Sequence, residues 1–492
     1  MSLKNIVGDL PKAVIHGLML LSGTALAQLI PALLSPALTR IYSPADFGIF
    51  AITFAILGVL APIVCLRYDI AIVLPHNDDE ASRLIVLCFA IAFALALLSM
   101  VGCAVFWFFA PTPKSAAIAA PLIAMIPIGV FLLGLQKVGQ SWSLRRKDFK
   151  IQSAALLTQA GVSIVTQIVL GFFWGSNPFF LIVGAQIGLF ASVVVFLVAL
   201  RSHVISDITP NVSTGGLIST FHQYIRFPLY TAPYAFAGQA ASRATLVILS
   251  TLASAGVVGQ YALAQRVVFL PLSTVMGTAS QVFYSRVARR LSDPRLQSTI
   301  RWTLVSSALI LGPFFALAFI YAESIFAFVF GERWSQAGGF ALLLIAPSML
   351  ITLTAWMDRV YDVLARQRLA LLMEIANDSV ALGALIVILL ITHSAIFAVA
   401  GFAVATVGFY LIWTFVTLQL INVRAIVFFE FVSTLAFVVL SLLAVAKLVA
   451  FLSANSWICA ATLMALASAY IVAGARHAWR GLGSMTPRAA ER

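Results

Sequence analysis

The residues that could bind a charged ligand are few, and they interrupt long apolar stretches. Only 10% of the 492 residues are charged, whereas 62% are hydrophobic. Arg243, Lys137 and Arg266 lie inside apolar runs, and Arg40 lies at the end of the first run. A guanidinium can hold a phosphate through two parallel hydrogen bonds. These cations predict a cavity for an anionic ligand. The alternative is that each is paired with a carboxylate or a helix-end carbonyl.

A polar stripe follows one face of a helix predicted over 151–173. Its members recur at helical spacing, which places them one above the other, and they are Gln152, Gln159, Ser163 and Gln167. Gln239 similarly stands one turn before Arg243. The stripe is typical of a wet cavity that passes sugar hydroxyls. Hydrogen bonds between helices would use the same residues, and the sequence leaves both interpretations open.

Three carboxylates are candidates for binding a coupling ion, either H⁺ or Na⁺. Asp69 closely follows Arg67 at the end of the second apolar run. Glu374 and Asp378 stand four residues apart, so they share a helix face. The alternative for this pair is an ion pair with a nearby arginine, Arg366 or Arg368.

The sequence contains no constellation typical of an enzyme. It has no Gly-rich phosphate loop, and its six histidines and four cysteines do not fall at metal-ligand spacings. No catalytic residue, metal site or cofactor is predicted. A membrane polysaccharide polymerase or ligase would need a larger outer loop for its acceptor machinery, which makes that class an alternative rather than the first hypothesis.

The elements that position these residues are membrane helices. A bilayer core takes about 20 apolar residues per helix, and the apolar runs predict an all-α polytopic membrane protein with about 14 spans. The predicted spans are 14–38, 47–66, 84–109, 116–140, 151–173, 179–200, 226–251, 258–284, 302–321, 338–357, 369–391, 395–421, 428–451 and 456–475.

Lysine and arginine in the polar breaks predict the orientation. With a cytoplasmic N-terminus, 23 of the 30 fall in cytoplasmic breaks and 3 in the opposite ones. Both termini are therefore expected in the cytoplasm. The net charge of +13 is explained by this asymmetry, so no nucleic-acid partner is expected.

The two halves of the chain are related. Segments 38–51 and 249–262 align at an offset of 211, with four identities: Leu38, Ser43, Gly48 and Ala51 match Leu249, Ser254, Gly259 and Ala262. This repeat predicts two pseudo-symmetric six-helix lobes, 1–210 and 211–422, with a substrate site between them. An additional helix pair over 423–476 and a cytoplasmic tail over 477–492 would follow.

Several motifs resemble those of the Wzx-type polysaccharide flippases, which belong to the MOP exporter superfamily. The most specific is RYDIAIVLP at 67–75 followed by NDDEA at 77–81. The others are SPADFGIFA at 43–51, RRKDFK at 145–150, VGQYALAQRVVFLPLS at 258–273 and SQVFYSRVA at 280–288. Arg243 corresponds to a position where this family commonly has an arginine.

The resemblance implies a MATE-like fold and a flippase in the bacterial inner membrane. Its cargo would be undecaprenyl-diphosphate-linked oligosaccharide for O-antigen, capsule or exopolysaccharide, moved by alternating access and coupled to H⁺ or Na⁺. A polysaccharide polymerase and a chain-length regulator are expected partners besides the lipid bilayer. The alternative within the same superfamily is an ion-coupled antiporter of drugs or other small molecules.

Overall fold

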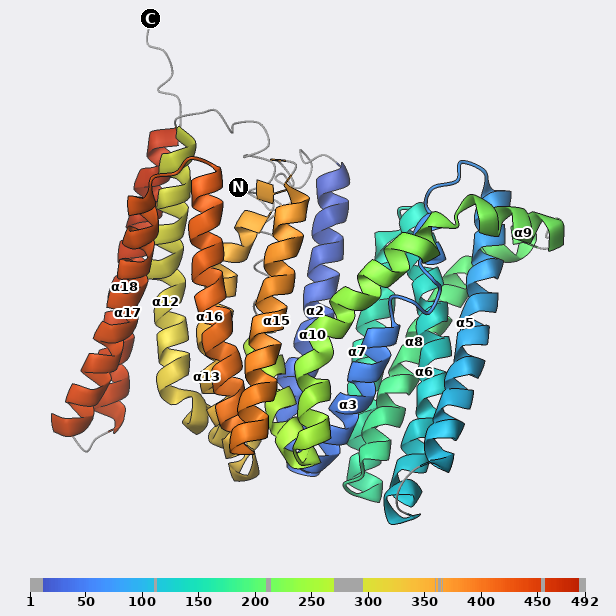
Figure 1. Cartoon of the computed structure of the whole chain (residues 1–492), viewed down its shortest axis with the longest axis horizontal. Coiled ribbons are helices and arrows are strands. Elements are labelled where there is room, and N and C mark those ends of the chain that lie inside the picture. The colour runs from blue at the N-terminus through green and yellow to red at the C-terminus, as the bar shows by residue number, and fades with distance from the viewer. Residues whose placement is uncertain are drawn as a thin grey trace, which may run out of the picture. The chain divides into compact units, whose positions relative to one another are not determined.

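The structure is a computed structural model that describes residues 12–109, 113–208, 214–269, 295–358, 360–361, 364, 366–452 and 456–485. These residues form helices joined by short turns, and no β-strand occurs among them. The chain divides into two compact units, Met1–Ala262 and Leu263–Arg492 (Figure 1). The all-α prediction is therefore confirmed.

The first unit begins with α2 (Lys12–Ile41), and α7 packs against both α2 and α8. A π-helix, η1 (Phe227–Thr231), leads directly into α10, which runs obliquely across α3 (Figure 1). The other helices of this unit are α3 (Pro44–Leu60), α4 (Tyr68–Ala71), α5 (Asp78–Phe108), α6 (Pro113–Arg145), α7 (Phe149–Trp174), α8 (Pro178–Ile208), α9 (Thr214–Gln223) and α10 (Ala232–Leu252).

A further helix over 255–269 continues from the first unit into the second. The elements that follow it are α12 (Arg295–Phe330), η2 (Glu332–Trp334), α13 (Ser335–Thr354), η3 (Ala355–Asp358), α15 (Gln367–Thr392), α16 (Ala395–Leu420), α17 (Ala425–Leu452) and α18 (Ser456–Met485).

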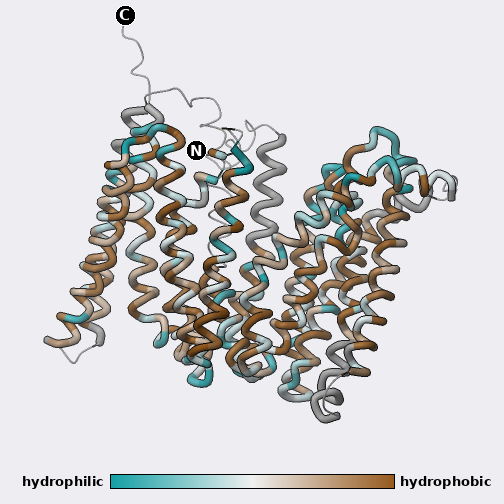
Figure 2. The backbone as a smooth tube through the Cα atoms, viewed as in Figure 1, coloured by the Kyte–Doolittle hydropathy of each residue, from teal (hydrophilic) through white to brown (hydrophobic). Residues whose placement is uncertain are grey.

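The helices have the length and composition of membrane spans. Among the described residues, nine helices are long and apolar enough to cross a bilayer, and two shorter apolar helices cover 26–41 and 44–60. Figure 2 shows hydrophobic residues along the helices and hydrophilic ones gathered at turns. The chain is a multi-pass membrane protein. Every predicted span overlaps a helix, but the number fourteen stays a prediction.

The second unit holds the predicted additional helix pair, α17 and α18, against α12. The guanidinium of Arg301 donates two hydrogen bonds of 2.6 Å to the carboxylate of Glu430, which fastens α17. His477 of α18 shares a 3.0 Å hydrogen bond with Ser306, and its ring contacts that of Trp302 with the centroids 3.9 Å apart. Polar contacts thus fix both helices of the pair at one end.

The division of the chain into units does not coincide with the sequence repeat. The first unit extends to residue 262 and includes α10, which belongs to the second half of the repeat. The predicted lobes 1–210 and 211–422 follow the repeat, whereas the units follow packing. The lobe boundaries stay a prediction.

The start of α3 explains most of the SPADFGIFA motif. Ser43 is the N-cap and Pro44 occupies the first turn. The Ser43 hydroxyl accepts the Asp46 backbone N–H at 3.2 Å, and the Asp46 carboxylate accepts the Ser43 N–H at 3.0 Å. This capping box satisfies two backbone donors that the helix itself leaves without partners. Ser, Pro and Asp in this motif therefore define where the helix begins.

The motif's glycine serves a different purpose, which is a close crossing with the equivalent segment of the repeat. A Cβ atom on Gly48 would collide with the carbonyl of Ala255, and a Cβ on Gly259 would collide with the carbonyl of Pro44. The two contacts are equivalent under the repeat: the offset of 211 relates Gly48 to Gly259 and Pro44 to Ala255. Only glycine lets two backbones approach this closely, so the repeat's matched glycines have a physical cause.

We expect the valine variants Gly48→Val and Gly259→Val to destabilise the protein. Each puts a branched side chain against backbone that cannot move aside, a change that costs about 1–3 kcal/mol in well-packed sites. Thermal unfolding of the detergent-purified protein should therefore begin several degrees lower. Gly102→Val is the control, because a Cβ there meets no other atom within 4 Å. Equal melting temperatures for all three variants would contradict this account of the crossing.

Candidate functional site

The segment after α3 turns sharply and carries a carboxylate into the core of the first unit. Leu66 and Arg67 have φ angles of 48° and 64°, in the left-handed region that non-glycine residues rarely adopt. Such residues store strain and gather at functional sites. The turn leads into α4 (Tyr68–Ala71), where the side chain of Tyr68 joins the hydrophobic core and Asp69 is only 6% exposed.

Asp69 lies in a group of ionisable residues. It is outside the candidate spans, and burial raises its pKa above the ordinary value of 3.8. The positive charges of Lys137 on α6 and of Arg67 partly offset that rise in pKa. Within the described residues Asp69 makes no ion pair as close as 4 Å, and the Nε of Arg67 is buried without a hydrogen-bond partner. The carboxylate is thus near cations without being locked to them.

The remainder of the 67–81 motif meets the RRKDFK motif. Arg145, at the end of α6, donates from Nε and Nη2 to Asp78 Oδ1 at 3.2 and 2.7 Å. Its Nη1 donates to the carbonyls of Ile72, at 3.3 Å, and Pro75. One guanidinium therefore fastens the loop before α5 to the end of α6. Asp78 and Arg145 have a structural role.

The first turn of α5 and the start of α4 also hold α9. Glu80 accepts a hydrogen bond from Gln223 Nε2 at 2.7 Å and another from the Tyr224 hydroxyl at 3.0 Å. The Tyr68 hydroxyl donates to the carbonyl of Phe221 at 3.0 Å. The motif thus joins α4, α5, α6 and α9 at one end of the unit, and Asp69 is its buried acid.

Arg243 lies on α10, and its side chain is exposed within the first unit. Its guanidinium passes over Gly58 of α3: a Cβ built there would be 3.2 Å from Nε. The structure records no hydrogen bond or ion pair between Arg243 and a described residue. One turn earlier is Gln239, which is also exposed, and Ser242 donates to its carbonyl at 2.9 Å. The pair predicted to share a face therefore lies on an open part of α10.

The polar stripe of α7 forms hydrogen bonds to neighbouring helices at two of its four positions. Gln136 of α6 donates from Nε2 to Gln159 Oε1 at 2.6 Å and to Ser192 Oγ at 3.0 Å. Gln167 is buried and donates to the carbonyl of Leu181 at 2.8 Å. These bonds support the interhelical alternative for Gln159 and Gln167.

The other two positions differ. Ser163 packs where a Cβ on Gly188 would be, so it too lies against α8. Gln152, nearer the start of α7, has an Oε1 atom that is buried and without a hydrogen-bond partner among the described residues. Gln152 is the member of the stripe with unused hydrogen-bonding capacity.

The remaining predicted residues do not join the Asp69 group. Arg40 is in the last turn of α2 and is exposed. Arg266, on the helix over 255–269, is partly buried and belongs to the second unit. Glu374 and Asp378 of α15 also belong to the second unit. Neither forms an ion pair with a described arginine, and Asp378 accepts a 3.4 Å hydrogen bond from Asn377. The ion pair with Arg366 or Arg368 is therefore not seen.

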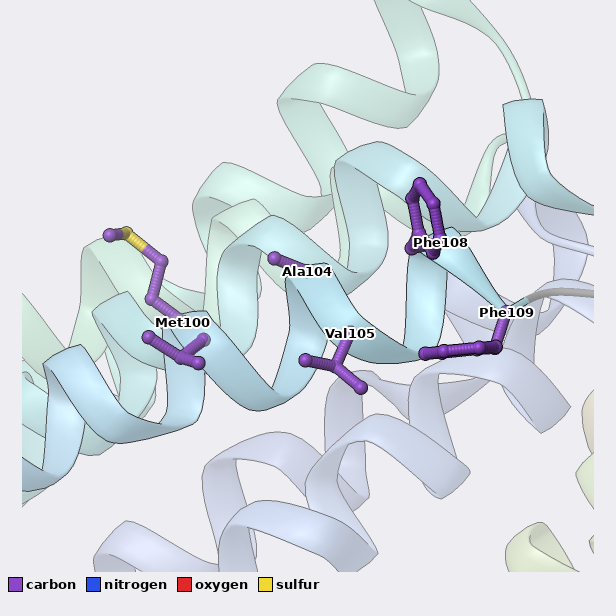
Figure 3. Close-up of a pocket in the computed structure, with 6 residues that line it drawn as sticks. Met100, Ala104, Val105, Phe108 and Phe109 are labelled. Carbon is purple, nitrogen blue, oxygen red and sulfur yellow. The ribbon is translucent and has the colours of Figure 1, made fainter.

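An apolar depression lies along the C-terminal part of α5 (Figure 3). Its lining residues are Met100, Val101, Ala104, Val105, Phe108 and Phe109. All six come from one stretch of helix and its end, and Phe108 is 82% exposed. A surface of this kind on a membrane span is suited to acyl chains and offers nothing to a polar ligand.

The family model described as "Polysaccharide biosynthesis protein" matches residues 37–338, which is more than half of the 492-residue chain. The chain belongs to this polysaccharide biosynthesis protein family. The match covers all of the motifs on which the resemblance was based. No curated protein sequence matches the chain significantly.

Solved structures of membrane proteins, some of them described as MOP superfamily transporters, share the fold of this chain. A lipid II flippase MurJ in an inward closed conformation is 14% identical, with a TM-score of 0.67, and the match covers 95% of this chain and 99% of that one. A MOP superfamily transporter from Pyrococcus furiosus is 15% identical, with a TM-score of 0.55 over 84% and 95%. An inward-facing MATE family transporter is 14% identical, with a TM-score of 0.51 over 82% and 93%. The chain shares the helical fold of these three proteins.

Three features of the site were not predicted from the sequence. Asp69 and Lys137 are 68 positions apart and were assigned to different roles, and Gly58 had no assigned role. Residues 66 and 67 give no sequence signal of a left-handed turn, because neither is glycine, asparagine or aspartate. Only the folded chain brings these residues to Asp69 and Arg243.

We expect Asp69→Asn to stabilise the protein at neutral pH. Because the folded-state pKa is raised, the fold favours the protonated acid, and the wild type loses stability as pH rises from 3.8 through the folded-state pKa. The loss is about 1.4 kcal/mol for each unit of pKa rise. We would measure the melting temperatures of both proteins from pH 4.5 to 8. At pH 8 the variant should melt above the wild type, and at pH 4.5 the two melting temperatures should be close. An asparagine variant that is less stable at pH 8 would contradict the assignment.

Proposed function

We propose that this protein is a flippase for undecaprenyl-diphosphate-linked oligosaccharide repeat units. It would move them from the cytoplasmic to the periplasmic leaflet by alternating access, to supply O-antigen, capsule or exopolysaccharide synthesis. The observation that carries the proposal is Arg243, the single charged residue of α10, which is exposed and without a partner among the described residues of a polysaccharide biosynthesis protein.

The physical chemistry of the cargo supports this assignment. An ionisable residue inside a membrane helix is costly and usually faces a cavity or a partner. A diphosphate is an anion that a planar guanidinium can hold at two points. The polyprenyl tail needs only an apolar path, which a helical membrane protein offers along its lipid-facing surface. Lys137, Arg266 and Arg40 are the other cations that we propose as candidates for binding phosphate.

The group around Asp69 is our candidate for ion coupling. A carboxylate whose pKa is raised by burial, and whose nearby cations are not in contact with it, can take up a proton or a sodium ion at modest cost. Glu374 and Asp378 of α15 form a second candidate group. Proton or sodium uptake at one of these groups would favour one conformation over the other.

The inner membrane of a bacterium is the proposed location, with both termini in the cytoplasm. The distribution of lysine and arginine over the polar breaks supports this orientation. A polysaccharide polymerase and a chain-length regulator would act on the delivered repeat units, so both are proposed partners. The alternative function is an ion-coupled antiporter of small molecules, favoured by the similarity in fold to a MATE transporter.

We expect Arg243→Ala to abolish the function in a cell. In a strain lacking the gene, the wild type should restore long-chain surface polysaccharide, Arg243→Ala should fail, and Arg243→Lys should restore it in part, because lysine keeps the charge but not the two-point geometry. Surface polysaccharide is measured on gels, at matched protein levels. Arg424→Ala is the control, since Arg424 is an exposed arginine in the turn between α16 and α17.

Two results would contradict the proposal. Normal polysaccharide in the deletion strain, together with altered tolerance to drugs, would favour the antiporter. Full activity of Arg243→Ala would show that the diphosphate is held elsewhere.

A further inference from the structure

The guanidinium of Arg243 lies directly against the position that a side chain on residue 58 would occupy. A Cβ on Gly58 would be 3.2 Å from Nε, 3.5 Å from Cζ and 3.6 Å from Nη2. Because these three distances are nearly equal, the plane of the guanidinium lies over the Cβ position of residue 58. The first of them is tighter than ordinary van der Waals contact between such atoms. An alanine at position 58 would therefore shift the guanidinium slightly, and a branched side chain would displace it further.

Nothing else among the described residues fixes this side chain by pairing. Arg243 makes no recorded hydrogen bond or ion pair with them, so its orientation depends on the surface over which it lies. That surface is α3, where the neighbouring Leu57 is buried in the core and holds the helix in place. The charge itself is constant, because arginine stays protonated in proteins.

We propose that Gly58 is a positioning residue, which holds the Arg243 guanidinium over α3 so that its donors are free to bind the diphosphate of the cargo. This inference rests on the proposed function. It adds a second element to the binding site: α10 supplies the cation, and α3 supplies the gap beside it.

Gly58 differs from the glycines that serve only close packing. Gly48 and Gly259 face backbone atoms, which cannot move without moving a helix. The three atoms nearest to a Cβ on Gly58 all belong to the far end of one flexible side chain, that of Arg243. A side chain at position 58 can therefore be accommodated by turning Arg243 away, which leaves the fold intact and removes the guanidinium from its place. A structural glycine and a positioning glycine thus predict different results.

The experiment measures binding of undecaprenyl diphosphate to the purified full-length protein by native mass spectrometry, with melting temperature as the check of folding. We expect Gly58→Val to weaken binding by about tenfold, the effect of losing a charge-assisted hydrogen bond. Gly58→Ala should weaken it less. Both should melt close to the wild type. Gly102→Val is the control for adding a branched side chain to a membrane helix, and it should bind normally.

A second comparison tests whether Gly58 acts through Arg243. In an Arg243→Ala background, Gly58→Val should change binding by less than about twofold, since coupled residues are not additive. An equal loss in both backgrounds would overturn the proposal, as would wild-type binding by Gly58→Val. A Gly58→Val variant that does not fold would contradict the argument that only Arg243 must move.

The outcome also separates this inference from the function on which it rests. If the wild type binds undecaprenyl diphosphate and Gly58→Val binds it equally well, the proposed function stands and the role of Gly58 is wrong. If the wild type itself does not bind undecaprenyl diphosphate, the diphosphate assignment is wrong, and the role of Gly58 falls with it.

Discussion

The cost of placing a charge inside a membrane is the constraint on which this structure depends. An arginine at the centre of a membrane helix costs about 2.5–3.5 kcal/mol by insertion measurements. A cation with a structural role is paired in this unit: Arg145, at the end of α6, is bonded to Asp78 and two carbonyls. Arg243 is exposed and lies over Gly58 with no described partner. We interpret Arg145 as a structural cation and Arg243 as a cation that binds the anionic cargo.

The most recognisable motifs of the sequence are largely structural. SPADFGIFA supplies a helix cap and, at Gly48, a backbone crossing with the equivalent repeat segment. The motif at 67–81 joins α4 and α5 to α6 and α9 through Tyr68, Asp78 and Glu80. A family is therefore recognised here by the residues that fix its fold. Within the second motif only Asp69 combines burial with a neighbouring but unbonded cation.

Much of the fold follows from composition, because apolar runs of bilayer length can form little else than helices. The repeat at an offset of 211 matched Gly48 to Gly259, and the structure shows that these two positions meet. The site was less predictable. Two polar stripe residues, Gln159 and Gln167, bond to other helices, which their spacing could not distinguish from a cavity lining. Spacing reports which face of a helix a residue lies on, and only packing decides what that face meets.

The central claim is that the protein moves a lipid-linked diphosphate sugar across a bilayer. It is tested most directly with purified protein in liposomes that carry a fluorescent undecaprenyl-diphosphate-linked oligosaccharide, by following its exposure to a quencher outside. The account predicts that wild-type protein makes the inner-leaflet pool accessible, faster with an imposed ion gradient, and that Arg243→Ala does not. Liposomes in which the wild type leaves the inner-leaflet pool as protected as in protein-free liposomes would contradict it.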